Sequence, residues 1–471
     1  MDRAPTARAP LRGLLHGRGG HRPSRRRAGR DRVQRRLIPS PAVSERLVIE
    51  GGHPLSGTIV PSGNKNAALP ILAACLLTDE EVVLENVPDI RDVHALLAIL
   101  DDVGVSIRED PDDPHTLVLR ADDVRTVTLD PDLCGRIRAS VLLAGPLLAR
   151  CGAVDLPMPG GDFIGRRRVD THLLAFRALG TDVEVGRVFR MRHDGLAGAD
   201  VFLDEASVTA TENALMAAAL APGQTVIRNA ACEPHVQDLA RFLVALGASI
   251  EGIGTNELRV EGVERLAGGT FRIPSDYIEV ASFIGLAAVT GSDIEITDVR
   301  PSDLRMIRIT FERMGIRVEV DGDSLRVPPA QDLRILADEG DAIPKIDDGP
   351  WPAFPADLTS IATAVATQAH GTVMIFEKMF ENRLFFVDKL VAMGARIILC
   401  DPHRAVVSGP ARLTGSRLES PDIRAGMAML IASLAADGVS TIGNVGQIDR
   451  GYERIDERLR AVGARIEREP G

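Results

Sequence analysis

The sequence predicts an α/β protein of two similar domains, each built from three βαβαββ units with helices inside and sheets outside. Three observations predict this fold class. One phrase, an apolar helix end followed by a glycine and an alternating strand, recurs six times along the chain. Six further helices are apolar nearly all round. The chain has 471 residues and 45% hydrophobic content, enough for two or more domains with large cores.

The recurring phrase predicts a helix, its end and the strand that follows. It occurs as LDDVGVSI, FRALGTDVEV, LVALGASIEG, FERMGIRVEV, LVAMGARIIL and LRAVGARIER, with glycines at Gly104, Gly180, Gly247, Gly315, Gly394 and Gly463. A glycine just past the last helical residue suits a left-handed helix end, and a period of two indicates a half-buried strand. After four of these strands a turn leads to a second strand, which predicts a hairpin: FRMRHD, LRVEGV, LRVPPA and AVVSGP.

A second phrase, which alternates with the first, predicts the buried helices. It has a polar start, a helix of small apolar residues, a turn and a strand, as in ENALMAAALAPGQTVIRNA and GMAMLIASLAADGVSTIGNV. A helix without a polar face is expected inside the domain. The two phrases together make a unit of about 70 residues. Six units arranged as two clusters of three buried helices give two domains, and a ligand cleft commonly lies between such domains.

Composition excludes several classes of protein. Charged residues make up 26% and are spread throughout, which excludes global disorder. No apolar run approaches the roughly 18 to 20 residues needed to span a bilayer, so a water-soluble protein is expected. The five cysteines have neither disulfide nor metal spacing, which predicts a cytoplasmic protein without a metal; they are Cys75, Cys134, Cys151, Cys232 and Cys400.

The charge is unevenly distributed. The net charge is −11, but residues 1–40 contain twelve Arg and two Asp, a balance of +10, which leaves −21 for the rest. Such a segment could be a nucleic-acid or membrane-surface arm, or a transit peptide. We favour a disordered Arg-rich leader over residues 1–43, because the ordered pattern begins abruptly near Glu45. The acidic remainder argues against nucleic acid as a partner.

Three polar clusters interrupt the repeats. The first, SGNKNAALP at residues 62–70, places Lys65 and Asn66 at the start of a buried helix, where backbone N–H groups and a lysine favour an anion. A simple helix cap is the alternative. The second, MPGGDFIGRRRVDTH at residues 158–172, surrounds Asp162 with glycines and precedes three arginines. This pattern predicts a mobile loop that closes over an anionic ligand, with a solvated surface loop as the alternative.

The third cluster consists of arginines at positions that the repeats suggest are equivalent. They are Arg138, Arg383, Arg424 and Arg450. Guanidinium groups match carboxylate and phosphate oxygens in pairs of hydrogen bonds. Several of them converging from different units would bind a small, doubly charged anion such as phosphoenolpyruvate, whereas each alone could be a surface ion pair.

With these clusters the sequence resembles the UDP-N-acetylglucosamine 1-carboxyvinyltransferase family of enolpyruvyl transferases, from about Glu45 to Arg468. The matching motifs are SGNKNAALP, LPMPGGDFIGRRRVDTH, SVTATEN, PWPAFPADLTS, FENRLFFVDKLVAMGA, PDIRAGMAML and IDRGYERIDERL. The resemblance implies the enolpyruvyl transferase fold, an inside-out α/β barrel in each of two domains. It also implies that domain I spans residues 65–274 and that domain II combines residues 44–64 with 275–471.

The resemblance implies transfer of enolpyruvyl from phosphoenolpyruvate to the 3-hydroxyl of UDP-N-acetylglucosamine, the first committed step of peptidoglycan synthesis. No cofactor and no obligate protein partner are implied. Asp357 resembles the general base and Asp162 the general acid; Lys65 and Arg424 complete the catalytic set. Substrate contacts are implied for Lys65, Asn66, Arg138, Arg167, Arg168, Val169, Asp170, Thr171, Ser207, Val208, Asp357, Met379, Arg383, Arg424 and Arg450.

Several positions depart from the family's pattern. Asp162 stands where many members have the cysteine that fosfomycin alkylates, which implies resistance to that antibiotic. Arg168 replaces a frequent Pro, Glu205 a Lys and Thr209 a Gly, while Tyr277 stands where Arg is common. Glu205 would repel a diphosphate unless it points away or a neighbouring arginine, Arg166 or Arg168, compensates. These departures leave three alternatives: a shikimate-type transferase, a paralogue that acts on another nucleotide such as UMP, or an inactive ligand-binding regulator.

Overall fold

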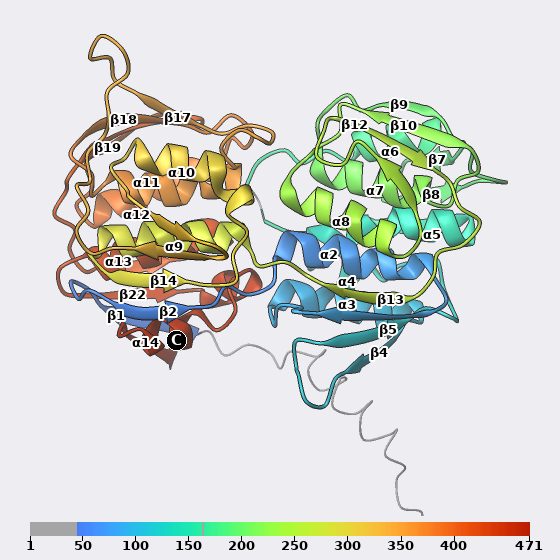
Figure 1. Cartoon of the computed structure of the whole chain (residues 1–471), viewed down its shortest axis with the longest axis horizontal. Helices are drawn as coiled ribbons and strands as arrows, with labels where there is room; N and C mark the ends of the chain where they lie inside the picture. The colour runs from blue at the N-terminus through green and yellow to red at the C-terminus, as the bar shows by residue number, and fades with distance from the viewer. Residues whose placement is uncertain (1–44, 163) are drawn as a thin grey trace, which may run out of the picture.

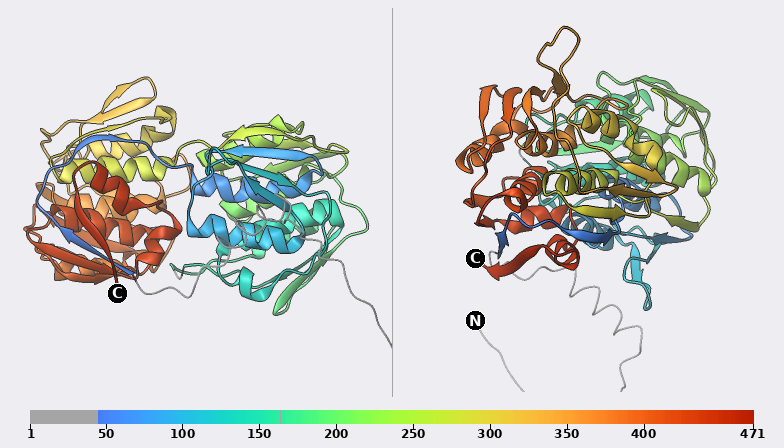
Figure 2. Two further views of the ribbon diagram at one scale, coloured as in Figure 1. Left: turned by 90° about the horizontal axis from the view of Figure 1, so that it is seen from below. Right: turned by 60° about the vertical axis from the view of Figure 1, so that its left-hand side comes forward.

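The chain forms two lobes that lie side by side (Figure 1). The structure, a computed structural model, describes residues 45–162 and 164–471; the leader predicted for residues 1–43 lies outside them. Lobe I has a hydrophobic core of buried residues from Ala67 to Ile273. The core of lobe II combines Leu47–Ile59 with buried residues from Tyr277 to Ile466. Figure 2 shows the N-terminal strands in the same lobe as the C-terminus.

Three four-stranded sheets surround the core of lobe II. Their strand orders are β2(Ser56–Ile59)-β14(Asp293–Ile296)-β16(Ser324–Val327)-β15(Glu319–Asp321), β17(Lys345–Asp347)-β18(Gly371–Phe376)-β20(Arg404–Gly409)-β19(Ile397–Asp401), and β21(Arg417–Glu419)-β22(Val439–Gly443)-β1(Glu45–Glu50)-β23(Arg465–Pro470). In each sheet the first two strands are parallel and the remaining pairs antiparallel.

Lobe I repeats the same arrangement. Two sheets have the orders β13(Gly269–Arg272)-β3(Glu81–Glu85)-β5(Leu117–Arg120)-β4(Ser106–Glu109) and β9(Asp200–Phe202)-β10(Gln224–Arg228)-β12(Glu257–Glu261)-β11(Ser249–Glu251). The third sheet is β6(Ala153–Pro157)-β8(Val188–Arg192)-β7(Asp182–Glu184), and its parallel partner is reduced to a bridge between Thr128 and Asp155. The six βαβαββ units that the sequence predicts are confirmed.

In two of the six units the sequence did not predict the partner of the strand that follows the glycine, for different reasons. In lobe I, β4 and β5 are joined through residues 110–116, a longer and more polar connection than in the other units. In lobe II, β23 pairs with β1, and the register sets Ile466 against Ile49. The partner of the last strand therefore lies at the other end of the sequence, where no local pattern can reveal it.

The six helices that the sequence predicts to be buried form the interior of both lobes. We call them the inner helices: α2(Lys65–Ala74), α5(Ala144–Cys151), α7(Val208–Ala218), α9(Tyr277–Val289), α11(Thr359–Ala366) and α13(Ile423–Ala435). In α13 every residue except Ala435 is buried. Small residues allow close packing: a Cβ added to Gly285 of α9 would lie 3.0 Å from the Val365 side chain of α11. The prediction of buried helices is confirmed.

Six outer helices are only partly buried, with one face toward the interior of a lobe and the other exposed. They are α3(Arg91–Val103), α6(Asp170–Ala178), α8(Pro234–Ala245), α10(Arg305–Glu312), α12(Val387–Ala392) and α14(Ile455–Ala461); a short helix, α4(Pro131–Cys134), lies between β5 and α5. The predicted glycine ends are confirmed, because Gly104, Gly180, Gly247, Gly315, Gly394 and Gly463 all have φ between 83° and 120°.

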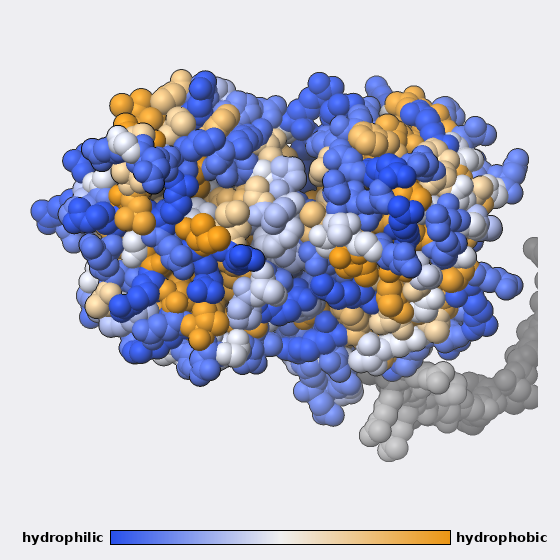
Figure 3. All heavy atoms as spheres, turned by 45° about the horizontal axis from the view of Figure 1, so that its top comes forward, coloured by the Kyte–Doolittle hydropathy of each residue, from blue (hydrophilic) through white to orange (hydrophobic). Residues whose placement is uncertain are grey.

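The face drawn in Figure 3 is largely hydrophilic, with scattered apolar patches. Among the residues that the structure describes, no helix has both the length and the apolar character needed to cross a membrane. In the same residues, no three His, Cys, Asp or Glu side chains group together as a metal site would require.

Candidate active site

The predicted site residues gather where helices begin, along the seam between the two lobes. Lys65 is the first residue of α2, and Arg424 is the second residue of α13. Asp357 lies in the short helix η4(Ala356–Leu358) that leads into α11. Ser207 is the N-cap of α7, and its Oγ accepts a hydrogen bond from Ala210 N. Backbone N–H groups and the helix dipole make such positions favourable for anions.

The four arginines do not occupy one equivalent position, so that prediction is wrong. Arg138 begins η2(Arg138–Leu143), which leads into the inner helix α5, and Arg424 lies in the inner helix α13. Arg383 and Arg450 lie in η5(Arg383–Phe386) and η6(Val445–Arg450), which precede the outer helices α12 and α14. Because the first two strands of each unit are parallel, both helices of a unit start at the same edge of the sheet. Each unit therefore has two positions at the seam.

Asp357 forms the centre of the lobe II side. Its Oδ1 accepts a hydrogen bond from Arg383 Nη2 at 3.0 Å. Its Oδ2 accepts from Arg424 Nε at 3.1 Å and from Arg424 Nη2 at 2.9 Å. Burial raises the pKa of Asp357, but the charges of Arg424, Arg383 and Lys65 outweigh it and hold the pKa well below its usual range. Asp357 is therefore an ionised carboxylate that must exchange partners before it can accept a proton.

A chain of ion pairs crosses the seam. Lys65 Nζ lies 2.9 Å from Asp92 Oδ2, and Arg450 Nε of lobe II donates to Asp92 Oδ1 at 2.8 Å. Arg450 Nη1 also donates to Asp162 Oδ1. Burial raises the pKa of Asp92, but the charges of Lys65 and Arg450 outweigh this effect and lower it. The buried carboxylate of Asp92 thus joins Lys65 to Arg450, and Arg450 in turn binds Asp162, the predicted general acid.

Sequence reasoning missed Asp92. It lies in the first turn of α3, where an acidic residue is common because it interacts favourably with the helix dipole. Nothing in the sequence distinguishes it from such an acid. Its function becomes visible only when Arg450, 358 residues away, is placed beside it.

The loop that carries Asp162 closes onto lobe II. Asn382 N donates to the carbonyl oxygen of Ile164 at 3.1 Å, and Arg166 N donates to Glu381 Oε1 at 3.1 Å. Gly165 has φ +141°, and a Cβ there would lie 2.5 Å from Glu381 Oε2. A larger residue at Gly165 would prevent this approach, so the glycine permits closure. Glu381 is a second contact residue that the sequence did not indicate.

Arg138 and Arg167 are partly buried arginines without an ion pair among the described residues. Arg138 Nη2 donates to the carbonyl oxygens of Arg167 and Arg168, each at 3.0 Å. Burial, together with the charge of Arg167, lowers the pKa of Arg138 to about 10. Burial and the charges of Arg383 and Arg450 lower the pKa of Arg167, while Asp357 and Asp162 raise it. Within residues 45–162 and 164–471, neither guanidinium has a carboxylate at ion-pair distance.

The predicted uridine diphosphate side lies at the start of α6 and α7. Arg168 Nε donates to Asp170 Oδ2 at 2.7 Å, and its Nη2 lies 3.7 Å from Asp204 Oδ2. The hydrogen bond and charge of Asp170, with smaller effects of Asp204 and Glu205, raise the pKa of Arg168. Arg168 therefore offsets the negative charge around Glu205, as the sequence analysis allowed.

The remaining predicted contact residues lie at the starts of α6, α7 and α2 and in the turn before Arg383. Val169 is the N-cap of α6, and Thr171 Oγ1 donates to Asp204 Oδ1 at 2.7 Å. Val208 opens α7 directly after its Ser207 cap. Asn66 lies in the first turn of α2, where its backbone N–H donates to the Asn64 side chain, and Met379 is half-buried in the turn before Arg383.

Tyr277 occupies an apolar contact between the lobes. It is buried in lobe II, and its ring stacks on His235 of lobe I with centroids 6.3 Å apart. The edge of Trp351 packs against it at 6.0 Å. Where Arg is common in the family, this chain therefore has a tyrosine that packs against the rings of His235 and Trp351.

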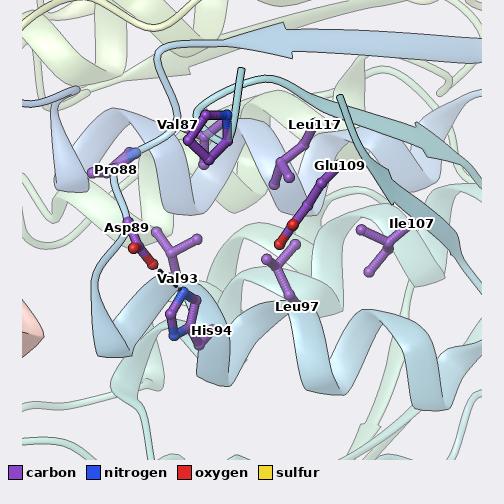
Figure 4. A pocket seen from close by; sticks show the side chains of 10 residues that line it. Val87, Pro88, Asp89, Val93, His94, Leu97, Ile107, Glu109 and Leu117 are labelled. Atoms are coloured by element: carbon purple, nitrogen blue, oxygen red, sulfur yellow. Dashed lines mark ion pairs between the residues drawn. The ribbon is translucent and has the colours of Figure 1, made fainter. Parts of the chain in front are cut away.

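A small surface pocket lies elsewhere (Figure 4). It sits over α3 beside the β4–β5 hairpin, and the ion pair between Asp89 and His94, 2.7 Å apart, lies at its edge. Its lining includes Val93, Leu97 and Ile107 and none of the predicted site residues. The converging charges at the seam therefore identify the candidate site.

The chain is similar to enolpyruvyl transferases over nearly its whole described length. The family model described as EPSP synthase (3-phosphoshikimate 1-carboxyvinyltransferase) matches residues 49–459. The UDP-N-acetylglucosamine 1-carboxyvinyltransferase of Bradyrhizobium diazoefficiens is 60% identical over 90% of this chain and 98% of its own length. The protein of the same name from Treponema denticola is 55% identical over 89% and 98%.

Solved structures agree with the fold. The enolpyruvyl transferase NikO from Streptomyces tendae has a TM-score of 0.80 and 26% identity, covering 91% of this chain and 99% of NikO. The EPSP synthase of Acinetobacter baumannii has a TM-score of 0.69 and 18% identity over 90% and 100%, which supports the fold alone. With the identities above, these matches establish that the chain belongs to the EPSP synthase family of enolpyruvyl transferases and, within it, to the UDP-N-acetylglucosamine 1-carboxyvinyltransferases.

Proposed function

We propose that this chain transfers the enolpyruvyl group of phosphoenolpyruvate to the 3-hydroxyl of UDP-N-acetylglucosamine and releases phosphate. This is the first committed step of peptidoglycan synthesis, and we place it in the cytoplasm. The observation that carries the proposal is the convergence of Lys65, Arg424 and Asp357 at the starts of three inner helices of two lobes. The chain is also 60% identical to a UDP-N-acetylglucosamine 1-carboxyvinyltransferase.

Phosphoenolpyruvate binds among the cations of the seam. Arg138 and Arg167 have no carboxylate partner in the described residues and supply uncompensated positive charge. Lys65 and Arg450 are held by Asp92, which keeps them in place for the ligand. Preorganised charges of this kind stabilise the developing charge of a transition state without reorganisation. No metal or organic cofactor enters the proposed mechanism.

The acceptor hydroxyl is activated by Asp357. As the sugar nucleotide binds, its 3-hydroxyl takes the place of one arginine hydrogen bond on the Asp357 carboxylate. This exchange lets the pKa of Asp357 rise toward the value that proton transfer requires, because a cationic hydrogen bond is lost. Arg424 remains bonded through two nitrogens and orients the carboxylate.

Addition and elimination then follow in order. The deprotonated oxygen attacks C2 of phosphoenolpyruvate while Asp162 donates a proton to C3, which gives a tetrahedral ketal phosphate. The bond between C2 and the phosphate oxygen then breaks, and C3 returns a proton to the Asp162 carboxylate. The departing phosphate takes the proton that Asp357 accepted from the hydroxyl, so the products are the enol ether and inorganic phosphate. Asp162 must leave Arg450 and become protonated for the first step, and the substrate phosphate at Arg450 favours both changes.

The sugar nucleotide lies toward α6 and α7. Ser207 and Val208 present the N-terminal end of α7, which suits a diphosphate. Arg168 compensates the acidic residues Asp170, Asp204 and Glu205 around it. The identity of 60% to a UDP-N-acetylglucosamine 1-carboxyvinyltransferase favours this acceptor over another nucleotide.

The test is phosphate release from phosphoenolpyruvate with each of three acceptors in turn. We expect release with UDP-N-acetylglucosamine and not with UMP or shikimate 3-phosphate. Release only with UMP would identify a nucleotide paralogue, and release only with shikimate 3-phosphate a shikimate-type enzyme. Phosphate release with none of them would identify a regulator. Each of these three results contradicts the proposal.

A further inference from the structure

Two buried carboxyl groups lie behind Arg383 and have no part in the mechanism above. Asp348 and Glu377 directly follow the parallel strands β17 and β18. The last paired residues of these strands are Asp347 and Phe376, so the next residue of each strand lies beside the other. Their exposed fractions are 1% for Asp348 and 0% for Glu377.

Each carboxyl group has one oxygen that accepts a hydrogen bond and one that does not. Asp348 Oδ1 accepts from Lys378 N, and Glu377 Oε1 accepts from Phe380 N at 3.1 Å. Asp348 Oδ2 and Glu377 Oε2 are buried and accept from no donor of the described residues. A buried polar atom without a partner is costly, and two adjacent carboxylates repel each other. One proton between the two groups removes both costs.

The electrostatics of the pair agree with a shared proton. The carboxyl of Asp348 lies within hydrogen-bonding reach of Glu377. Burial raises the pKa of Glu377 to about 8, with a further contribution from Asp348 and an opposing one from Arg383. When two such groups interact strongly, the proton belongs to the pair rather than to one residue.

Arg383 connects this pair to the candidate site. Its Nε lies 3.8 Å from Glu377 Oε2 and makes no hydrogen bond, while its Nη2 donates to Asp357. Arg383 is only 3% exposed, so the carboxyl groups of Asp357 and Glu377 are its main counter-charges. The other groups that face the pair are the Thr359 hydroxyl of α11 and His403, whose Nδ1 lies 2.7 Å from the carbonyl oxygen of Glu377.

We propose that Asp348 and Glu377 share one proton and act together as a positioning pair that holds Arg383 against Asp357. With one proton the pair carries a single negative charge, which balances Arg383 from behind. Without the proton, two negative charges draw the guanidinium away from Asp357. The proposal concerns a role for Asp348 and Glu377 in the enolpyruvyl transfer described above and rests on that function for its activity readout.

The test compares Glu377→Gln and Asp348→Asn with the matched control Asp347→Asn. Asp347 is the adjacent residue and pairs with Lys345 and Lys378 at the surface, away from Arg383. For the wild type we expect kcat to fall about tenfold per pH unit above the point where the pair loses its proton, near pH 8. In both pair variants this fall should begin at least one pH unit higher, and the KM for phosphoenolpyruvate should change less than twofold. Asp347→Asn should follow the wild type.

If kcat falls at the same alkaline pH in the wild type and all three variants, the proposal is overturned. A second readout does not need turnover. The folded pair holds a proton that the unfolded chain has released by pH 7, so stability falls as the pH rises toward about 8. The melting temperature of the wild type and of Asp347→Asn should therefore fall more between pH 6 and pH 9 than that of either pair variant. Equal falls would overturn the proposal even if phosphate release failed with every acceptor, a result that contradicts only the proposed function.

Discussion

The two lobes are built from the same unit, yet they present their charges to the seam in different ways. In lobe II, Arg383 and Arg424 are paired with Asp357, and Arg450 is paired with Asp92 and Asp162. In lobe I, Arg138 and Arg167 have no carboxylate partner among the described residues. From this difference we infer that Arg138 and Arg167 of lobe I attract the anion, whereas the arginines of lobe II exchange their carboxylate partners for the substrates.

Loss of the lobe II carboxylate should have the largest effect. In Asp357→Asn the hydrogen bonds to the arginines can persist in part, but the base is gone. We expect kcat for phosphate release to fall on the order of 10³-fold, because general base catalysis contributes about 10²- to 10⁴-fold. The KM for phosphoenolpyruvate should change little. A fall of less than tenfold in kcat would show that another group accepts the proton.

Removal of a free lobe I cation should affect binding of the anion. Arg167→Ala should lower kcat/KM for phosphoenolpyruvate about 10- to 100-fold, because a hydrogen bond to a charged group contributes about 1.5–3 kcal/mol. The matched control is Arg136→Ala, an exposed arginine near the same segment that should change kcat/KM less than twofold. If both variants lose the same activity, the unpaired charge of Arg167 has no special function.

The position of Asp162 in the site can be tested through its reactivity toward fosfomycin. A carboxylate at position 162 offers no thiolate to an epoxide, so we expect the wild type to retain activity in fosfomycin. Asp162→Cys should become inactivated with time, at a rate at least tenfold above the wild type. Prior incubation with phosphoenolpyruvate should slow the inactivation. Continued resistance of the cysteine variant would place position 162 away from the phosphoenolpyruvate site.

A prediction remote from the reaction concerns stability at acid pH and belongs to lobe I. His172 is buried, its Nδ1 accepts from Asn213 and its Nε2 lies 3.1 Å from Thr209 Oγ1. Burial lowers the pKa of His172 to about 3, so the unfolded chain binds a proton that the folded chain does not, and stability falls as the pH drops from 6.5 toward 3. At pH 4 this amounts to about 3 kcal/mol.

The check is a comparison of melting temperatures. His172→Gln should lose fewer degrees than the wild type between pH 7 and pH 4, although it starts from a lower value because part of the buried hydrogen-bond network is lost. Glu377 in lobe II has the opposite dependence, because its raised pKa adds stability as the pH falls from about 8 toward 4.5. Glu377→Gln should therefore lose more degrees than the wild type between pH 7 and pH 4. An identical acid slope in His172→Gln and the wild type would contradict the assignment.

Much of this fold could be predicted from the sequence because the ends of the helices and strands in each unit are marked by local residues. The glycine after each outer helix and the apolar composition of each inner helix are local signals, and both were confirmed. The pairing of β1 with β23 and of β13 with β3 was not predictable, because these partners lie far apart in the chain.

The candidate site was predicted less completely. Lys65, Asp162 and Asp357 stand in motifs that interrupt the repeats, so the sequence reveals them. Asp92, Glu381 and the Asp348–Glu377 pair lie at ordinary helix, turn and strand ends. Their importance depends on which side chain of a distant segment they meet. The prediction that the four arginines occupy equivalent positions was wrong for a related reason. Each unit has two helix starts at the seam, and a sequence motif does not show to which of them an arginine belongs.

The most direct test of the account is the crystal structure of Asp357→Asn with phosphoenolpyruvate and UDP-N-acetylglucosamine bound. The account predicts the phosphate of phosphoenolpyruvate within hydrogen-bonding distance of Lys65 and Arg167. Arg450 should have released Asp162, and the sugar 3-hydroxyl should lie against residue 357. A phosphate bound away from these cations, or Asp162 still paired with Arg450 in the filled site, would contradict the exchange of partners between the two lobes.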